Sequence, residues 1–441
     1  MNRRDLLAAV AAMGMAPGAR ALAADGDLKA AAREAWIFAL PLIEMGQARM
    51  RMLRARPGDQ PAAVNRFVHG RDLATPASRA ITTPNNDTLY SSAWLDLTAG
   101  PATLTLPASG KRYLSVAVLD MYTDNDAILG TRTLGGEGGT FTLVGPKQPG
   151  SGPNLVRVAT PHAWVLARTL VDGEADLAAA HAVQDGIVLK GPATAAPPAV
   201  AARNAPAGDY FASAQALLAS DPPRPEDLGL FRRVAALGLG PASGFDPKRF
   251  NAGELAQIEA GVAEAKAMIF GNAGRQTFID GWSYPRANLG LFGQDYLFRA
   301  MVALGGLAAL TPVEAMYMRA QGEDGGGRFT GDGLHRLTMP ANLPLDGFWS
   351  LTMYEATPQG QFFLTQNPIK RYAIGDRTGG LKRAPDGSLD IWIGRADPGG
   401  ERSANWLPAP AQGPFAMTLR AYLPRAEMLD GRFRFPPVVK A

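Results

Sequence analysis

Residues 82–97 read TTPNNDTLYSSAWLDL, a polar run that passes directly into an apolar alternation. The run Asn85, Asn86 and Asp87 favours a turn, because such side chains bond the backbone two residues further on. After the turn, side chains on a strand alternate between its two faces. Tyr90 is therefore expected to share a face with its polar neighbours Thr88 and Ser92, so the polar surface continues from the turn into the strand.

The segments around this run divide into three blocks after an initial helical stretch. Short alternating runs separated by Gly and Pro predict an N-terminal antiparallel β-sandwich in 25–171 and a jelly-roll-like C-terminal sandwich in 328–441. Helical spacing returns between them, in 172–327. The stretch 27–54 has the same spacing, and Pro41 is expected to divide it into a helix pair. The predicted fold class is mixed and mainly β.

The first 24 residues have the pattern of a secretory signal peptide. Arg3 and Arg4 precede an apolar run of about a dozen residues, and Ala21-Leu22-Ala23 is a small-x-small cleavage pattern. The paired arginines resemble the twin-arginine export signal, although Asn2 stands where Ser or Thr is usual. The apolar run is shorter than the ~20 residues of a membrane-spanning helix. We therefore expect a periplasmic or secreted protein without a membrane span in the mature chain.

Composition excludes several classes of function. Removing residues 1–24 takes away three Arg and one Asp, so the formal net charge falls from +4 to +2. A chain this close to neutral lacks the clustered positive charge that binds nucleic acid. The chain has no cysteine, which excludes disulfides, thiolate metal sites and a cysteine nucleophile. Its four histidines lie far apart without HExxH spacing, and no nucleophile elbow or phosphate loop occurs, so no cofactor is indicated.

Several longer motifs carry a family resemblance. PNNDTLYSSAWLDL and YLSVAVLDMYTDNDAILGTRT resemble the bacterial domain-of-unknown-function family 1254. FWSLTMYEA, NPIKRYAIGDRT, DGSLDIWI and the segment that begins NWLPAP resemble the partner family 1214. The resemblance covers nearly the whole mature chain. It implies an N-terminal β-sandwich, a helical middle segment and a jelly-roll-like C-terminal domain, and it supplies no catalytic residues.

Asp87 is the first candidate catalytic residue, with two alternatives open. It closes a structural hydrogen-bond corner, or it is a pocket carboxylate that acts as a base with Tyr90 as the acid. Asp120 is the alternative base, because it ends an apolar strand and could face Asp87. The loop from Asp120 to Asp126 has oxygen ligands that suit Ca²⁺, but a solvated acidic loop is the favoured interpretation because the spacing departs from the calcium-loop pattern.

The C-terminal domain supplies most of the candidate binding residues. FWSLTMYEA alternates, so Ser350, Thr352 and Tyr354 should share the face opposite Trp349. Aromatic, amide and arginine side chains are the groups that recognise sugars and aromatic acids, although a single Trp is more often core. Together with Asn85 and Asn86, the candidate substrate-binding residues are Trp349, Tyr354, Arg371, Asn405, Trp406 and Arg420. Arg371 or Arg420 is expected to pair with an acidic residue of the N-terminal domain.

Two classes of function follow, and the sequence does not choose between them. The first is a cofactor-independent hydrolase or lyase with a small or saccharide-like substrate, in which Arg371 orients an anionic group. The second is a periplasmic ligand-binding or envelope-interaction protein that uses the same residues without catalysis. In both, the site is expected in a cleft between the domains, lined by the 85–90 turn and the NWLPAP loop.

Overall fold

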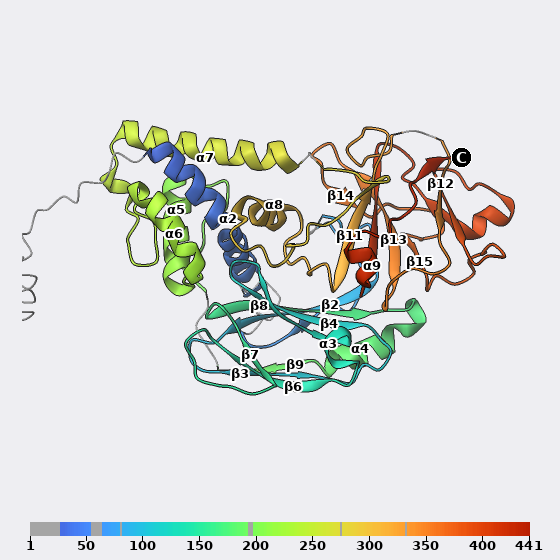
Figure 1. Cartoon of the computed structure of the whole chain (residues 1–441), viewed down its shortest axis with the longest axis horizontal. Helices are drawn as coiled ribbons and strands as arrows, with labels where there is room; N and C mark the ends of the chain where they lie inside the picture. Colours follow the sequence, from blue (N-terminus) through green and yellow to red (C-terminus); the bar gives the residue numbers. More distant parts are fainter. Residues whose placement is uncertain (1–26, 54–63, 80–81, 193–196, 274–275, 331–332) are drawn as a thin grey trace, which may run out of the picture.

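The computed structural model describes residues 27–53, 64–79, 82–192, 197–273, 276–330 and 333–441. The predicted signal peptide, residues 1–24, lies outside these ranges. Figure 1 shows three parts: an N-terminal sandwich at the bottom, a helical layer at the upper left and a C-terminal sandwich at the upper right. The described strands form four sheets, which confirms the predicted mixed, mainly β class.

The N-terminal sandwich consists of a five-stranded and a four-stranded sheet. The first has the order β1 (Val68–His69), β2 (Thr88–Asp96), β8 (His162–Leu170), β4 (Leu114–Asp120) and β5 (Asn125–Gly130). The second has the order β7 (Leu155–Arg157), β6 (Gly139–Val144), β3 (Ala102–Leu106) and β9 (Val188–Lys190), and α3 (Thr131–Leu134) and α4 (Leu177–Asp185) lie beside the sheets. Apolar residues at alternate positions, such as Leu95, Val116 and Val165, fill the space between the sheets.

The helical layer surrounds one long helix, α2 (Leu28–Leu53), and contains α5 (Ala207–Ser220), α6 (Leu228–Arg233), α7 (Ala252–Ala273) and α8 (Tyr296–Gly305). The prediction that Pro41 divides 27–54 into two helices is wrong, because α2 continues through it. A proline removes one helical N–H, but the run Ala35–Gly46 is buried, so packing offsets that loss. Helix α7 crosses α2 so closely that Gly261 has no room for a Cβ beside the carbonyl of Lys29.

The C-terminal sandwich also pairs two sheets. One has the order β10 (Trp282–Ser283), β11 (Ala315–Ala320), β18 (Phe415–Tyr422), β13 (Trp349–Ala356) and β14 (Phe362–Phe363), with β15 (Ala373–Gly375) also on β13. The other has the order β17 (Trp406–Pro408), β16 (Leu389–Gly394), β12 (His335–Met339) and β19 (Val439–Lys440), and α9 (Ala426–Leu429) follows β18. Trp349, Leu351 and Met353 lie in the core between these sheets, as the alternation predicts.

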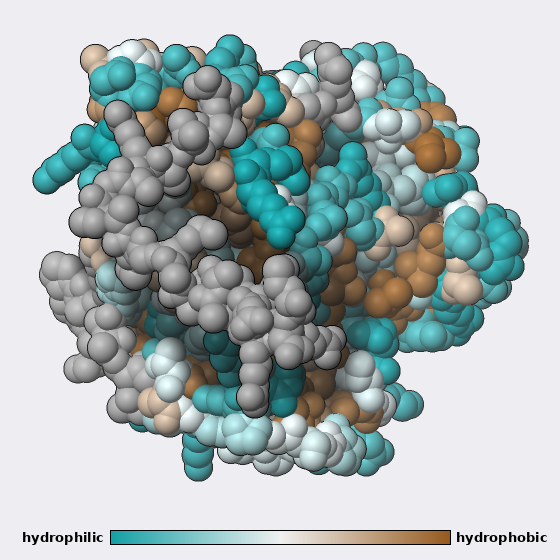
Figure 2. Space-filling model, turned by 60° about the vertical axis from the view of Figure 1, so that its left-hand side comes forward, coloured by the Kyte–Doolittle hydropathy of each residue, from teal (hydrophilic) through white to brown (hydrophobic). Residues whose placement is uncertain are grey.

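One hydrophobic core joins the three parts. It contains the central residues of α2, outward-facing residues of the first sheet such as Trp94 and Leu119, and Phe348 and Tyr422 of the C-terminal sandwich. The predicted helical block also contributes to both sandwiches, since β9, β10 and β11 lie within 172–327 and pair with sheet strands. Figure 2 shows a hollow in one face, where hydrophobic residues gather inside a more hydrophilic rim. None of the helices in the described part of the chain is long and apolar enough to cross a membrane.

Candidate functional site

Two rows of polar side chains come together where the N-terminal sandwich meets the C-terminal sandwich. Cross-strand neighbours lie on the same face of a sheet, so each row crosses three strands. In each row an arginine lies between a tyrosine and a serine: Tyr90, Arg168 and Ser115 on β2, β8 and β4, and Tyr317, Arg420 and Ser350 on β11, β18 and β13. Tyr90 and Tyr317 pack against the same hydrophobic core, so the two rows are close together. Burial raises the pKa of Tyr317, and the charges of Arg168 and Arg420 lower it.

The turn that opens β2 makes the first contact between the domains. Oδ1 of Asn85 accepts a hydrogen bond from the backbone N–H of Asp87 at 2.6 Å, so the predicted turn is confirmed. The carboxylate of Asp87 accepts a hydrogen bond from Oγ of Ser350 at 2.6 Å, and Nδ2 of Asn85 donates to the hydroxyl of Tyr422 at 2.8 Å. Asn85 therefore closes the turn, while the buried carboxylate of Asp87 joins it to β13.

Arg420, on β18 of the C-terminal sandwich, also contacts this turn. Its guanidinium is buried and donates to the hydroxyl of Tyr354 at 2.7 Å and to Oγ1 of Thr352 at 2.8 Å. It also donates to the carbonyl of Thr83 at 3.2 Å, and the hydroxyl of Tyr354 donates to the carbonyl of Pro84 at 2.8 Å. Arg420 thus reaches the N-terminal domain through backbone oxygen. The contact with Thr83 crosses between the domains directly, and Tyr354 adds a second contact through Pro84.

Arg168 has a different environment, because part of its guanidinium is unsatisfied. Its side chain lies over the ring of Tyr90, and its exposed fraction is only 5%. Nη2 donates to the carbonyl of Ala308 at 2.8 Å, but Nη1 has no hydrogen-bond partner among the described residues. Burial lowers the pKa of Arg168, and the nearby tyrosines, foremost Tyr90 and Tyr317, raise it above its ordinary value, so the group stays charged. A buried cation without a carboxylate partner is costly, and an anionic ligand would relieve that cost.

Aromatic rings surround this charge. The ring of Tyr422 stacks on Phe348 at a centroid distance of 4.0 Å and meets the edge of Tyr113 at 5.1 Å. Burial raises the pKa of both tyrosines, so they stay protonated near neutral pH. In contrast to these closed rings, Tyr90 and Tyr317 retain partial exposure. Tyr90 and Tyr317 are therefore the aromatic rings of this group that retain contact with solvent.

Asp120 lies in another network, at the opposite end of β8. The carbonyl of Asp87 accepts from Val171, just beyond β8, whereas Asp120 pairs with Ala163 near its start. At ~3.3 Å per residue these eight residues separate the two carboxyl groups by about 26 Å. The expectation that Asp120 could face Asp87 is therefore wrong. The sequence shows where a strand ends. The pairing register, which the sequence does not show, decides which ends of neighbouring strands lie side by side.

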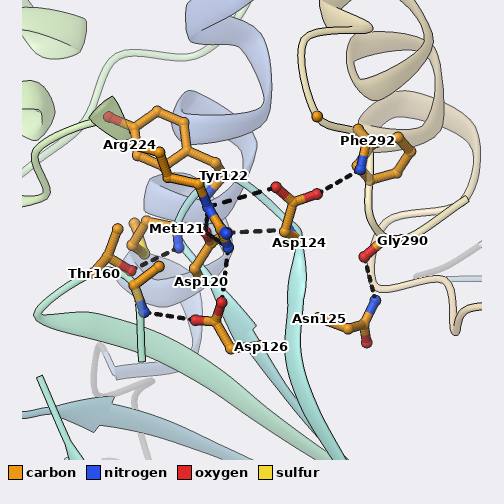
Figure 3. A network of polar contacts seen from close by, with 12 residues as sticks. Asp120, Met121, Tyr122, Asp124, Asn125, Asp126, Thr160, Arg224, Gly290 and Phe292 are labelled. Atoms are coloured by element: carbon orange, nitrogen blue, oxygen red, sulfur yellow. Dashed lines mark hydrogen bonds and ion pairs between the residues drawn. The ribbon is translucent and has the colours of Figure 1, made fainter. Parts of the chain in front are cut away.

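The network around Asp120 joins the first sheet to the helical layer (Figure 3). Arg224 donates from Nη2 to Oδ2 of Asp120 at 2.8 Å and to Oδ1 of Asp126 at 2.7 Å. Nη2 of Arg299, on α8, donates to Oδ2 of Asp124 at 3.1 Å. Burial raises the pKa of all three carboxyl groups, and that of Asp120 reaches about 6 because Asp126 adds to the effect. The prediction of a solvated acidic loop is wrong, since Asp120 and Asp124 are buried and paired with arginine.

Backbone groups satisfy most of the remaining oxygens in this loop. Oδ1 of Asp120 accepts from the N–H groups of Tyr122 and Asp124, and Oδ1 of Asp124 accepts from the N–H of Phe292. Asn125 donates to the carbonyl of Gly290 (Figure 3). Within the described residues, no group of three or more His, Cys, Asp or Glu side chains is arranged to hold a metal ion. The loop is thus built as an interdomain clamp, and the suggested Ca²⁺ would have to displace its arginines.

Two segments of the chain match known protein-family models. Residues 64–191 match the family model described as protein of unknown function (DUF1254), and residues 314–426 match the model described as protein of unknown function (DUF1214). The chain contains a DUF1254 domain followed by a DUF1214 domain. The DUF1254 match contains Asp87, Tyr90 and Arg168, and the DUF1214 match contains Tyr317 and Arg420, among other residues. The site therefore lies where the two family domains meet.

The fold recurs in solved structures. The crystal structure of the VPA0106 protein from Vibrio parahaemolyticus is similar, with a TM-score of 0.70 and 21% sequence identity over 94% of this chain and 100% of that chain. An uncharacterised protein from Burkholderia cenocepacia has a TM-score of 0.45 and 12% identity over 94% of each chain. Comparison with curated proteins gave no match. The first similarity shows that the same overall fold occurs in that protein.

The other candidate residues lie apart from the interdomain rows. Trp349 is in the core of the DUF1214 domain. Nε1 of Trp406 donates to the carbonyl of Gly394 at 2.9 Å, and Nδ2 of Asn405 donates to the carbonyls of Lys382 and Asp390. Nη1 of Arg371 donates to the carbonyls of Ala404 and Trp406, so this arginine does not reach the DUF1254 domain. The structure therefore does not bring the NWLPAP loop to the 85–90 turn, because β17 belongs to the other sheet.

Asn86 also has a local role, since its Nδ2 donates to the carbonyl of Ala74 at 2.6 Å within the DUF1254 domain. Sequence reasoning missed Arg168, Tyr317 and Arg224. The sequence does contain a signal for Arg168, because this charged residue interrupts an apolar strand at an outward-facing position, as Arg420 does. Arg224 had none, because it lies in a Pro-rich connection and its partners are about a hundred residues away in the chain.

Proposed function

We propose that this is an exported protein that binds a small aromatic carboxylate at the junction of its two sandwiches. The observation that carries the proposal is the buried guanidinium of Arg168, which is charged and has an Nη1 without a hydrogen-bond partner among the described residues. A carboxylate fits the planar donors of arginine. The partly exposed rings of Tyr90 and Tyr317 offer flat apolar surfaces beside it, which favours an aromatic body for the ligand.

Binding without catalysis is the function that we favour. A hydrolase or lyase at this junction would need a general base near the ligand. The carboxylate of Asp87 is held by Ser350, and Asp120 lies at the far end of β8 with Arg224. Neither of the two predicted bases is available beside Arg168. Recognition, by contrast, requires only the cation and the two aromatic rings that are already in place.

An Arg168→Met variant tests this proposal. Benzoate should raise the melting temperature of the wild-type protein, because a ligand that binds only the folded state stabilises it. Benzamide, its neutral isostere, should have little effect. The variant should lose the benzoate effect and be at least as stable without ligand, since replacing a buried unpaired charge by an apolar side chain removes a desolvation cost. Differential scanning calorimetry measures all of these effects.

The matched control is Arg66→Met, which removes an exposed arginine of the same domain. It should respond to benzoate as the wild type does. The proposal fails if benzoate and benzamide act alike, or if the Arg168→Met variant still responds to benzoate. A strong loss of stability in that variant would instead show that Arg168 is a structural tie.

The proposal that the protein is exported depends on residues 1–24, and it is tested by a separate experiment. We propose that the leader directs the protein to the periplasm and is removed after Ala23 or Ala24. Expression with the natural leader should give a periplasmic protein that begins near residue 25, as determined by N-terminal sequencing. Replacing Arg3 and Arg4 by Lys should leave the full-length precursor in the cytoplasm if the twin-arginine route is used. Export of the Lys-Lys variant at the normal rate would point to another route, and retention of the natural chain would argue against export.

A further inference from the structure

A second polar site lies at the junction of the helical layer and the N-terminal sandwich, away from the interdomain rows. A cavity of about 270 Å³ lies between the end of α2, the adjoining ends of β2 and β8, and α5. Its polar end consists of Arg49, Asp96, Thr98 and His162. Its apolar end includes Pro197, Val200 and Leu217. The cavity is therefore amphipathic, with charged groups at one end only.

His162 is held between two carboxylates at the polar end. Its Nδ1 lies 2.9 Å from Oδ2 of Asp221, the residue that caps α5, and its Nε2 lies 3.4 Å from Oδ2 of Asp96. Burial lowers the pKa of His162, but the two aspartates raise it above its ordinary value. Asp221 is fully buried and also accepts hydrogen bonds from the backbone N–H of His162 and from Ser220. Asp221 therefore fixes the ring, and the ring's other nitrogen points toward Asp96.

Arg49 supplies the feature that points to a ligand. Its exposed fraction is 6%, and Nη2 lies 3.6 Å from Oδ2 of Asp96, which is too long for a good hydrogen bond. Its Nε has no hydrogen-bond partner among the described residues, although the side chain lines the cavity. A buried arginine donor without an acceptor is costly. The cavity is thus placed to bring an acceptor oxygen to Arg49.

The balance of charge at this end limits the kind of ligand. Arg49 and protonated His162 are positive, Asp96 and Asp221 are negative, and the four charges cancel. Burial would raise the pKa of Asp96, but hydrogen bonds from His162 and Thr98 keep it far below its ordinary range. A ligand with a net charge would unbalance the buried groups, whereas a zwitterion would not. Among the described residues, Oδ2 of Asp96 has the two long contacts with Arg49 and His162, so it can also accept from an ammonium group.

We propose that this cavity binds a small α-amino acid with an aliphatic side chain. Its carboxylate accepts from the Nη groups of Arg49, which lines the cavity, and its ammonium group donates to Oδ2 of Asp96. Its side chain lies against the apolar end formed by Pro197, Val200 and Leu217. The volume of about 270 Å³ is just below the ~300 Å³ at the lower end of small-molecule sites, so the ligand must be as small as an amino acid. This second site shares no residue with the proposed carboxylate site at Arg168.

Isothermal titration calorimetry on the mature chain tests the zwitterion directly. The three probes are L-leucine, 4-methylpentanoate, which lacks the ammonium group, and 3-methylbutylamine, which lacks the carboxylate. L-leucine should bind at least tenfold more tightly than either of the others. Equal binding of 4-methylpentanoate would overturn the role of Asp96. Equal binding of the amine would overturn the role of Arg49, and failure of L-leucine to bind at millimolar concentration would overturn the site itself.

Substitutions locate the binding in the cavity. Ala216 is an exposed residue of α5 that lines it, so Ala216→Trp should fill the space and abolish L-leucine binding without loss of folding. Ala212→Trp is the matched control, because Ala212 is exposed on the same helix and does not line the cavity. Arg49→Lys keeps the charge but lacks the planar guanidinium, and it should weaken binding at least tenfold. Unchanged binding in Ala216→Trp or Arg49→Lys contradicts the proposal, and Arg168→Met should bind L-leucine normally.

Discussion

Replacing Arg224 by methionine is expected to lower the free energy of unfolding by about 3–5 kcal/mol at pH 7, because it leaves buried carboxylates without their cation. Arg224 bonds Asp120 and Asp126 directly, and its Nε lies 3.8 Å from Asp124. Without it, Arg299 is the remaining partner and reaches only Asp124. Urea denaturation of wild type and variant measures the difference. Arg232→Met, an exposed arginine of the same layer, is the control and should change stability by less than about 0.5 kcal/mol.

The same variant should show a characteristic pH dependence. The pKa of Asp120 is about 6 in the folded protein and 3.8 in its ordinary state. This raised pKa stabilises the fold fully below pH 3.8, and the contribution is lost as the pH rises through about 6. Removing Arg224 should raise the carboxyl pKa values further, so the deficit should be large at pH 7 and smaller at pH 5. An equal deficit at both values would show that the loss reflects packing and not charge, and adding Asp120→Asn to the variant should restore part of the stability at pH 7.

Asp87→Ala is expected to lower the free energy of unfolding by about 2–3 kcal/mol, since it leaves Oγ of Ser350 buried without its charged acceptor. Ser350 is 1% exposed, so water cannot easily replace the carboxylate. Asp87→Asn keeps an acceptor and should lose less, about 1 kcal/mol. Chemical denaturation followed by circular dichroism gives these values. Asp72→Ala, at an exposed position of the same domain, is the matched control.

Benzoate binding separates the two roles of Asp87. If it is an interdomain tie, Asp87→Ala loses stability but its folded form still responds to benzoate. If it is a ligand group, the response disappears while stability is retained. The structure favours the first result, because the carboxylate is bonded to Ser350 and the exposed fraction of the residue is only 6%.

The features that depend on local periodicity were predictable from the sequence. The alternation after Asp87 placed Tyr90 on the same face of β2 as Thr88 and Ser92. The alternation in FWSLTMYEA placed Ser350 and Tyr354 opposite the core residue Trp349. The Asx turn at Asn85 followed from residue chemistry alone. In these cases each residue's position is set by its neighbours in the chain.

The relations between distant segments were not predictable. Asp120 and Asp87 both border strands of one sheet, but the register puts them at opposite ends. Arg371 and Arg420 both occur in apolar surroundings, yet only Arg420 faces the other domain. His162 looked like one of four isolated histidines, and its partner Asp221 lies 59 residues away. Pairings of this kind arise from packing in three dimensions, and a single sequence does not record them.

The central helix α2 has a consequence for how the chain reaches its native state. It is the first described element, but its Arg33 pairs with Glu264 across 231 residues. Its apolar residues pack in a core that includes Ala300 of α8. Contacts between such distant segments require closure of a long loop, and folding slows as their share rises. The apolar surface of α2 is therefore buried only after segments more than half a chain length away have packed against it. We expect a long-lived, aggregation-prone intermediate in refolding, in which the N-terminal sandwich is formed and α2 is still undocked.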